Sequence, residues 1–239
     1  MELVNRESPD AGAEAAAESR EWAVFQAFRH RNYRLFFAGQ LVSLIGTWMQ
    51  SVAQSWLVYR LTGSAVMLGL VGFSSQIPVF LVAPLGGAVS DRHNRRLILI
   101  AAQSASMLLA FVLAALTLTH RVHVVHIFVL AAALGVVNAF DIPTRQAFVV
   151  DMVGRDDLLN AIALNSSMFN GARIIGPAIA GVLVASIGEG WCFFVNAMSY
   201  LAVITGLLMM KITAQARVPL PGSALASIIE GFRFAGAPG

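Results

Sequence analysis

The sequence predicts an all-α membrane protein with six transmembrane helices. Of its 239 residues, 57% are hydrophobic and 12% are charged, and the mean hydropathy is +0.72. Soluble domains carry about 25% charged residues. Six apolar stretches each approach the roughly 20 residues that cross the hydrocarbon core of a bilayer. Backbone groups in lipid must be satisfied within each segment, and the alternating pattern of a β-barrel is absent, so these stretches are predicted to be helices.

The six stretches follow one another with short connections. The predicted spans are 35–58, 66–89, 97–118, 124–143, 158–187 and 191–210. Residues 1–34 are predicted to be a cytoplasmic tail that ends in an amphipathic interfacial helix over 21–34, with Trp22, Phe25 and Phe28 on one side. Residues 35–210 form the six-helix bundle, and residues 211–239 form a cytoplasmic central linker that looks truncated.

The basic residues predict how the chain is oriented in the membrane. Alternating spans place one group of them on the N-terminal side: Arg6, Arg20, Arg29, Arg31, Arg34, Arg92, Arg95, Arg96, Arg145, Arg155, Lys211, Arg217 and Arg233. Arg60 and Arg121 fall on the other side, and Arg173 lies inside a span. Because short basic loops stay in the cytoplasm, both ends of the chain are predicted to be cytoplasmic.

The connection between the second and third spans carries the most specific motif. Its residues are Gly87, Asp91, Arg92, Asn94, Arg95 and Arg96, spaced as G-x-x-x-D-R-x-N-R-R. At Asn94 we expect a positive φ, which Asn tolerates better than most residues. Gly86 and Gly87 should allow close helix contact just before the turn, and so short a loop should make its two flanking helices neighbours.

This motif resembles the signature loop between helices 2 and 3 of the major facilitator superfamily of transporters, which usually has Gly where this chain has Asn94. Such transporters have twelve helices in two halves, each built from two inverted three-helix repeats. The resemblance covers nearly the whole chain and implies the N-terminal half of such a protein. It also implies that the loop is a gate, in which Asp91 engages a helix end of the other half while the arginines pair with acids such as Asp141 or Asp151.

Polar side chains form a stripe along the first span, where Gln40, Ser43, Thr47, Gln50 and Gln54 recur at steps of three and four. We expect the stripe to line a substrate cavity; the alternative is hydrogen bonding between packed helices. The predicted cavity residues are Gln40, Thr47, Gln50, Gln54, Asn138 and Asn170.

Charged residues inside the spans predict a second site. Asp141, Arg145 and Arg173 form the predicted intramembrane charge network, and ionisable residues at this depth are functional candidates. The partner of Asp141 is predicted to be Arg173, Arg95 or Arg96. Two interpretations stay open: a structural ion pair that fixes helix register, or a proton carrier if Asp141 is partly unpaired.

The fifth span contains Gly171, Gly176, Pro177 and Gly181. This series resembles the Gly-Pro motif in helix five of the superfamily's exporters, and the segments 141–148 and 170–177 resemble the enterobactin-exporter-like branch, which includes macrolide-efflux-like members. The resemblance implies a secondary exporter, with proton-coupled antiport of amphipathic small molecules such as siderophores or drugs, acting by alternating access in the prokaryotic plasma membrane.

Several other classes lack support in the sequence. No phosphate-binding Gly-rich loop and no Ser-His-Asp arrangement is present, so neither an ATP-driven pump nor an enzyme is predicted. The single Cys192 and the histidines at 120, 123 and 126 predict no metal site and no cofactor.

The predicted partners are the lipid bilayer, a small-molecule substrate, protons, and a C-terminal six-helix half or a second copy of the chain. Nucleic acid is not among them, because the basic residues follow the membrane sides. The alternative function is a truncated half-transporter or a membrane assembly subunit with no transport activity alone.

Overall fold

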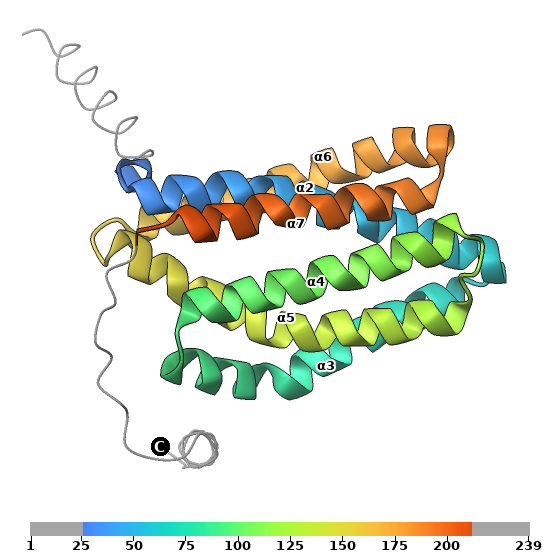
Figure 1. Cartoon of the computed structure of the whole chain (residues 1–239), viewed down its shortest axis with the longest axis horizontal. Coiled ribbons are helices and arrows are strands. Elements are labelled where there is room, and N and C mark those ends of the chain that lie inside the picture. Colours follow the sequence, from blue (N-terminus) through green and yellow to red (C-terminus); the bar gives the residue numbers. More distant parts are fainter. Residues whose placement is uncertain (1–25, 212–239) are drawn as a thin grey trace, which may run out of the picture.

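The structure is a computed structural model that describes residues 26–211 as a bundle of long antiparallel helices (Figure 1). Its elements are the 3₁₀ helix η1 (Gln26–Arg29), α2 (Arg31–Thr62), α3 (Ala65–Arg92), α4 (Arg95–Leu118), α5 (Val124–Val153), α6 (Leu158–Ile187) and α7 (Glu189–Met209). The six helices α2 to α7 are all long and apolar enough to cross a membrane. The prediction of an all-α, six-helix bundle is confirmed.

The predicted end of the fourth span at Pro143 is wrong, since α5 continues to Val153. A proline removes one backbone donor and often ends a helix in a soluble protein. Helices packed in a membrane tolerate it because neighbouring groups satisfy the freed carbonyl. Pro78 and Pro84 likewise lie within α3, and Pro177 lies within α6.

The helix contacts repeat in two halves of the bundle. Helix α3 packs on α5 as α6 packs on α2, α4 packs on α5 as α7 packs on α2, and α4 and α7 pack on each other. Exchanging the first three helices with the last three leaves this scheme of contacts unchanged. Since three helices reverse the chain direction, the two triplets are inverted relative to each other, as the predicted repeats require.

The short loop between α3 and α4 does not make these helices close neighbours, as we had expected. They barely touch, because α5 packs between them and takes most of the contacts of α3 (Figure 1). Gly86 lies against the backbone of Ala139 in α5, whereas a side chain at Gly87 would meet no atom within 4 Å. A short loop sets the direction of the next helix, but small residues decide which helix it contacts.

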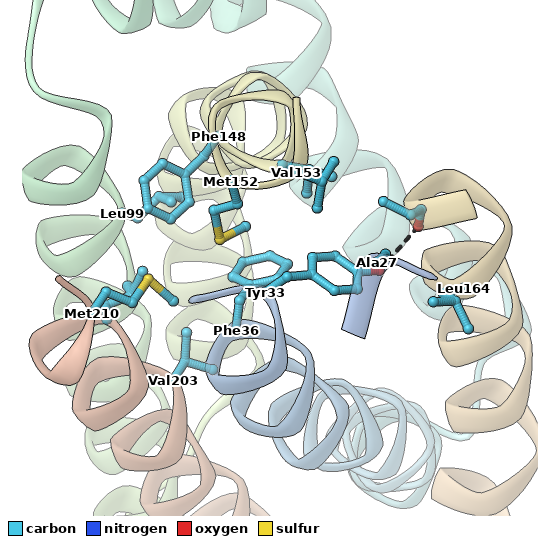
Figure 2. Packing of buried hydrophobic residues seen from close by; sticks show 13 residues of the cluster. Ala27, Tyr33, Phe36, Leu99, Phe148, Met152, Val153, Leu164, Val203 and Met210 are labelled. Carbon is cyan, nitrogen blue, oxygen red and sulfur yellow. Dashed lines mark hydrogen bonds between the residues drawn. The ribbon is translucent and has the colours of Figure 1, made fainter. Parts of the chain in front are cut away.

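The first and last described residues meet at one end of the bundle, where the side chain of Asn32 donates to the carbonyl of Lys211 at 2.9 Å. We call this the basic end; it also holds the α3–α4 and α5–α6 connections. Its core is an aromatic and aliphatic cluster around Tyr33 (Figure 2). The Tyr33 hydroxyl donates to the carbonyl of Ala161 at 3.1 Å, and the Ala27 N–H donates to Asn160 at 2.9 Å.

These contacts revise the prediction of an interfacial helix over 21–34. Residues 26–29 form η1, and α2 begins at Arg31, so the described part of this stretch packs into the bundle. Ala27 and Tyr33 are fully buried, because the Tyr33 ring fills the space between α2, α5 and α6 while its hydroxyl is hydrogen-bonded. Residues 1–25 and 212–239 lie outside the described residues. The cytoplasmic position of these two terminal segments stays a prediction.

Candidate functional site

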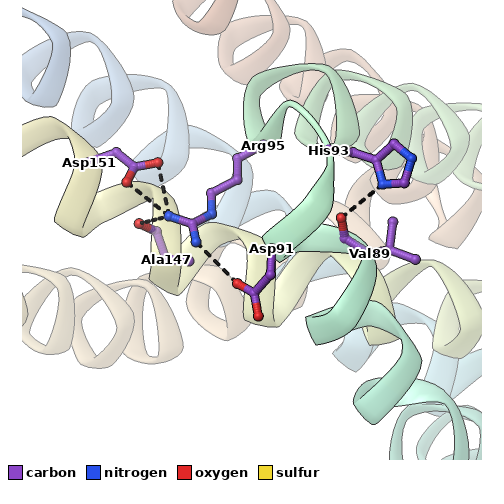
Figure 3. Close-up of polar contacts among 6 residues, drawn as sticks. All are labelled: Val89, Asp91, His93, Arg95, Ala147 and Asp151. Carbon is purple, nitrogen blue, oxygen red and sulfur yellow. Dashed lines mark hydrogen bonds and ion pairs between the residues drawn. The ribbon is translucent and has the colours of Figure 1, made fainter. Parts of the chain in front are cut away.

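The predicted gating loop is centred on Arg95 (Figure 3). Its guanidinium donates to both carboxylate oxygens of Asp151, at 2.9 and 3.0 Å, and to Asp91 at 3.2 Å. A fourth bond, of 3.2 Å, reaches the carbonyl of Ala147 in α5. Asp91 lies in the last turn of α3, Arg95 begins α4, and Asp151 lies in the last turn of α5. One side chain therefore ties three helices together.

The other polar residues of the loop have separate partners. Asn94 caps α4 by accepting from the N–H of Arg96 at 3.0 Å, and its φ is −68°, so the expected positive φ is wrong. A side-chain cap requires extended backbone rather than a left-handed turn. Arg96 donates to the Leu208 carbonyl at 2.8 Å, at the negative end of the α7 dipole. Arg92 is exposed.

The buried acid Asp141 has its partner on its own helix. Arg145, one turn away in α5, contacts its carboxylate at 2.9 Å, and Gln103 of α4 donates to the other oxygen at 2.8 Å. Asp141 is 4% exposed. The three partners named from the sequence, Arg173, Arg95 and Arg96, all point elsewhere. An i,i+4 partner satisfies the charge at no cost in helix rearrangement.

The third member of the predicted charge network, Arg173, lies apart from Asp141 and Arg145. Its guanidinium lies over the ring of Trp48 in α2, 5.5 Å from the ring centroid. The ring of Phe169 meets Trp48 edge-on at a centroid distance of 5.4 Å. Arginine over an aromatic face is a favourable arrangement where full hydration is lost.

The polar stripe of α2 faces two different cavities. Thr47, Gln50 and Gln54 line a cavity of about 490 Å³ together with Asn138 of α5. Gln40 lines a smaller cavity of about 320 Å³ near the basic end, beside Arg145. The stripe divides because it spans about four helical turns and the neighbouring helices change along it.

Asn170 lines a third cavity, of about 590 Å³ between α5 and α6. The predicted cavity residues therefore all face cavities, but they do not share one.

The sequence did not lead us to expect that α7 contributes to the cavity of about 490 Å³. Asn196 donates to the side-chain oxygen of Gln50 at 2.7 Å, and both residues line the cavity with Tyr200. Gln50 therefore combines both interpretations of the stripe, since it bonds to a neighbouring helix and faces the cavity. The polar run Asn196, Ser199 and Tyr200, at steps of three and one in an apolar span, was the available signal.

A comparison with known proteins completes this description. A profile of the family described as transmembrane secretion effector, one of the major facilitator families, matches residues 22–238. The chain belongs to this family of the major facilitator superfamily. No solved structure matches it.

Curated relatives of this facilitator include siderophore and drug transporters. The staphyloferrin A transporter of Staphylococcus aureus is 30% identical over 75% of this chain and 46% of its own length. The multidrug efflux pump Tap of Mycolicibacterium fortuitum is 27% identical, over 84% and 51% respectively. The enterobactin exporter EntS of Shigella boydii is 25% identical, over 86% and 49%. The chain thus spans about half the length of the relatives it matches.

The glycines of the Gly-Pro series in α6 differ in how closely another helix approaches them. A side chain at Gly176 would lie 2.6 Å from the Cβ atom of Trp48, so this glycine lets α6 approach α2. Side chains at Gly171 and Gly181 would meet no atom of the described residues within 4 Å. Only the central glycine serves helix packing within this bundle.

A further charge cluster at the basic end was not anticipated. Asp157, which precedes α6 and is 3% exposed, contacts Arg29 at 2.8 Å and His30 at 2.7 Å. The hydrogen bond from His30, aided by the charge of Arg29, holds the pKa of Asp157 below its usual range, although burial acts in the opposite direction. The cluster fastens η1 to the start of α6.

The two histidines at the opposite end form a helix cap. The His123 N–H donates to Nδ1 of His126 at 3.1 Å, where α5 begins. Among the described residues, no group of three His, Cys, Asp or Glu side chains is placed to hold a metal ion.

Proposed function

We propose that the chain is part of a secondary exporter that moves amphipathic small molecules, such as siderophores or drugs, by alternating access and proton-coupled antiport. The observation that carries the proposal is the cavity of about 490 Å³ lined by polar, uncharged side chains within an apolar bundle. A cavity of this size suits a drug-sized ligand. The named activities of the relatives agree with export.

The proton would act on the pair between Asp141 and Arg145. In this conformation Asp141 is fully paired, as a structural ion pair requires, so proton uptake would belong to another step of the transport cycle. Protonation of Asp141 removes the charge that holds Arg145, and the freed guanidinium would then face the cavity of about 320 Å³ that it already lines. The side-chain oxygen of Gln103 has no hydrogen-bond partner among the described residues. This acceptor, next to the carboxylate, favours a water that could deliver the proton.

The gating loop would hold one of the two transport conformations. Its central arginine Arg95 bridges α3, α4 and α5, whereas Asp91 is 57% exposed at the end of α3. We propose that this end faces the cytoplasm and that Asp91 engages a helix end in a second six-helix half. Loss of that contact would free the two halves to rock about the cavity.

The alternative proposal is a half-transporter fragment or membrane assembly subunit with no transport of its own. It is supported by the chain's share of its relatives' length, 46% to 51%, and by the very open surface of α3. A second copy of the chain is a further candidate for the missing half.

The test is efflux from cells that express this chain, beside cells that express it extended by its genomic continuation, with hydrophobic dyes and a catecholate siderophore. Export by the extended form alone would assign the activity to a two-half protein. Export by the chain alone would show that it assembles with itself. Export by neither form would refute the proposal.

The gate has its own variant in this assay. Asp91→Asn should reduce efflux at least tenfold, which corresponds to a rise of about 1.4 kcal/mol in the transport barrier, while the amount of inserted protein stays near wild type. Arg155→Gln is the matched control, because Arg155 is an exposed arginine at the same end of the bundle but outside the gating loop. Wild-type efflux by Asp91→Asn would reject the gate.

A further inference from the structure

The arginine in the middle of α6 differs from the other arginines of the bundle in its partner. Arg29, Arg60, Arg95 and Arg145 all contact carboxylates. Arg173 instead lies over the face of Trp48, at 5.5 Å from the ring centroid. It is exposed near the midpoint of a helix that is long enough to cross the membrane. An arginine at such a depth is costly unless an anion or a water-filled cavity meets it.

The Trp48 ring under Arg173 forms part of the wall of the cavity of about 490 Å³. Trp48 and Phe169 both line this cavity of about 490 Å³ and meet each other edge to face at 5.4 Å. The two rings meet at an interplanar angle of 74°, a favourable arrangement for aromatic pairs, and together they give this part of the cavity wall an aromatic surface. Arg173 itself is not among the residues that line the cavity, but it lies over a ring that does.

The remaining lining residues carry no charge. They contribute amide and hydroxyl groups from Gln50, Gln54, Asn138 and Tyr200, and neither an Asp nor a Glu is among the described residues that line the cavity. The nearest acid in α5, Asp141, is held by Arg145 and Gln103. The described lining residues thus carry no negative charge, and one arginine lies against a ring in the cavity wall, so the field favours an anionic ligand.

We infer that this cavity selects amphipathic organic anions, with the ligand's planar ring against Trp48 and Phe169 and its carboxylate or phenolate paired with Arg173. The inference rests on the proposed function, since it names the substrate class of the same cavity. Arg173 is then the residue that determines charge specificity. The bond to an anion replaces the weaker contact of the guanidinium with the Trp48 ring.

The test compares three probes of one shape: 2-naphthoate, 2-naphthamide and 2-naphthylmethylammonium. Their binding to the purified full chain in detergent micelles is measured by equilibrium dialysis. Naphthoate should bind about tenfold more tightly than the amide, because its carboxylate can form a bidentate ion pair with the guanidinium whereas the amide offers one neutral acceptor, and the ammonium should bind most weakly. Equal binding of naphthoate and amide, or a preference for the ammonium, would overturn the inference.

Variants assign the preference to the residue. Arg173→Gln should remove the preference for naphthoate and leave amide binding unchanged, and Arg173→Lys should keep part of the preference because it keeps the charge. Arg121→Gln, an exposed arginine at the opposite end from the gate, is the matched control and should bind all three probes as wild type does. If Arg173→Gln lowers naphthoate and amide binding equally, Arg173 has a structural role and the inference fails.

A repeat with the genomically extended chain distinguishes a substrate from a carboxylate of a second half. If the preference for naphthoate is present in the short chain and absent in the extended one, an acid of the second half is the natural partner of Arg173, and the inference is overturned. Its failure is separate from failure of the proposed function, because efflux of uncharged dyes by the extended chain would continue. Persistence of the preference in both forms supports the inference.

Discussion

Two arginines of this bundle each bind an aspartate that lies four residues earlier in the chain. The two pairs differ in how far they are exposed. Arg145 contacts Asp141 at 2.9 Å, and the side chain of that acid is 5% exposed. Arg95 contacts Asp91 at 3.2 Å, and that acid is 57% exposed. Both pairs have the spacing i,i+4, so sequence distance alone does not distinguish them.

Burial separates the two pairs energetically. An exposed pair contributes about 0–1 kcal/mol, because water screens the charges and the side chains lose freedom when they pair. Removing one partner of a buried pair costs about 3–5 kcal/mol, because the other charge stays buried without compensation. The comparison teaches that the exposed pair suits a gate that opens and closes, whereas the buried pair yields only when a charge is removed.

The largest effect should come from breaking the buried pair. Arg145→Leu leaves Asp141 without its cation and should lower the free energy of unfolding by about 3–5 kcal/mol, measured by denaturant unfolding in micelles. The double variant Asp141→Asn with Arg145→Gln removes both charges and should recover most of that loss.

The control for this prediction is Arg155→Leu, at an exposed position between α5 and α6 that should change stability little. If Arg145→Leu were as stable as the double variant, burial of the ion pair would not explain the difference between the two arginine–aspartate pairs.

A smaller effect is expected at the centre of the gate. Arg95→Gln loses the charged bonds to Asp151 and Asp91 and should cost about 1–2 kcal/mol, because the guanidinium is only 17% exposed but its partners are partly hydrated. The measurement is the same unfolding assay, with Arg92→Gln as a control. A loss as large as that of Arg145→Leu would contradict the contrast between the pairs.

Asp157 adds a third acid to the comparison of the two pairs, because its side chain is buried but lies outside the membrane spans. Its pKa is lowered in the folded chain, chiefly by the bond from His30, so its contribution to stability is complete above the unfolded value of about 3.9. That contribution is lost as the pH falls through the folded pKa.

The corresponding measurement is thermal unfolding at a series of pH values from 5 downwards. Asp157→Asn should unfold at a lower temperature than wild type at pH 5, and the difference should shrink in acid. Asp156→Asn, at the exposed neighbouring position, should show no such difference at pH 5. A gap between wild type and Asp157→Asn that does not depend on pH would refute the role of the carboxylate charge.

The smallest effect on stability is expected at Asp91. Asp91→Asn should change the free energy of unfolding by less than about 1 kcal/mol, and the difference should fall further in 1 M salt, where the screening length is about 3 Å. Its predicted defect in efflux then reports on gating alone. A loss of stability that persists in high salt would place this acid with the buried pair.

The sequence by itself determined the fold class, the family and the approximate spans. Hydrophobic length, scarce charge and the D-R-x-N-R-R loop are local properties, and a bilayer forces every such apolar stretch to become a helix. The sequence also placed Asp141 and Arg145 on one face of one helix, by their step of four, but it named Arg173, Arg95 or Arg96 and not Arg145 as the partner of Asp141.

The tertiary structure decided which of these residues meet. Only the packing of α5 between α3 and α4 separates the helices joined by the gating loop, and it brings Asp151 to Arg95. The packing of α6 on α2 brings Arg173 to Trp48. The polar stripe of α2 is divided between two cavities because different helices pack beside its two parts. Contacts between helices depend on where small residues such as Gly86 and Gly176 allow close approach. The residues that each of these glycines contacts are far away in the chain, so the local sequence does not identify them.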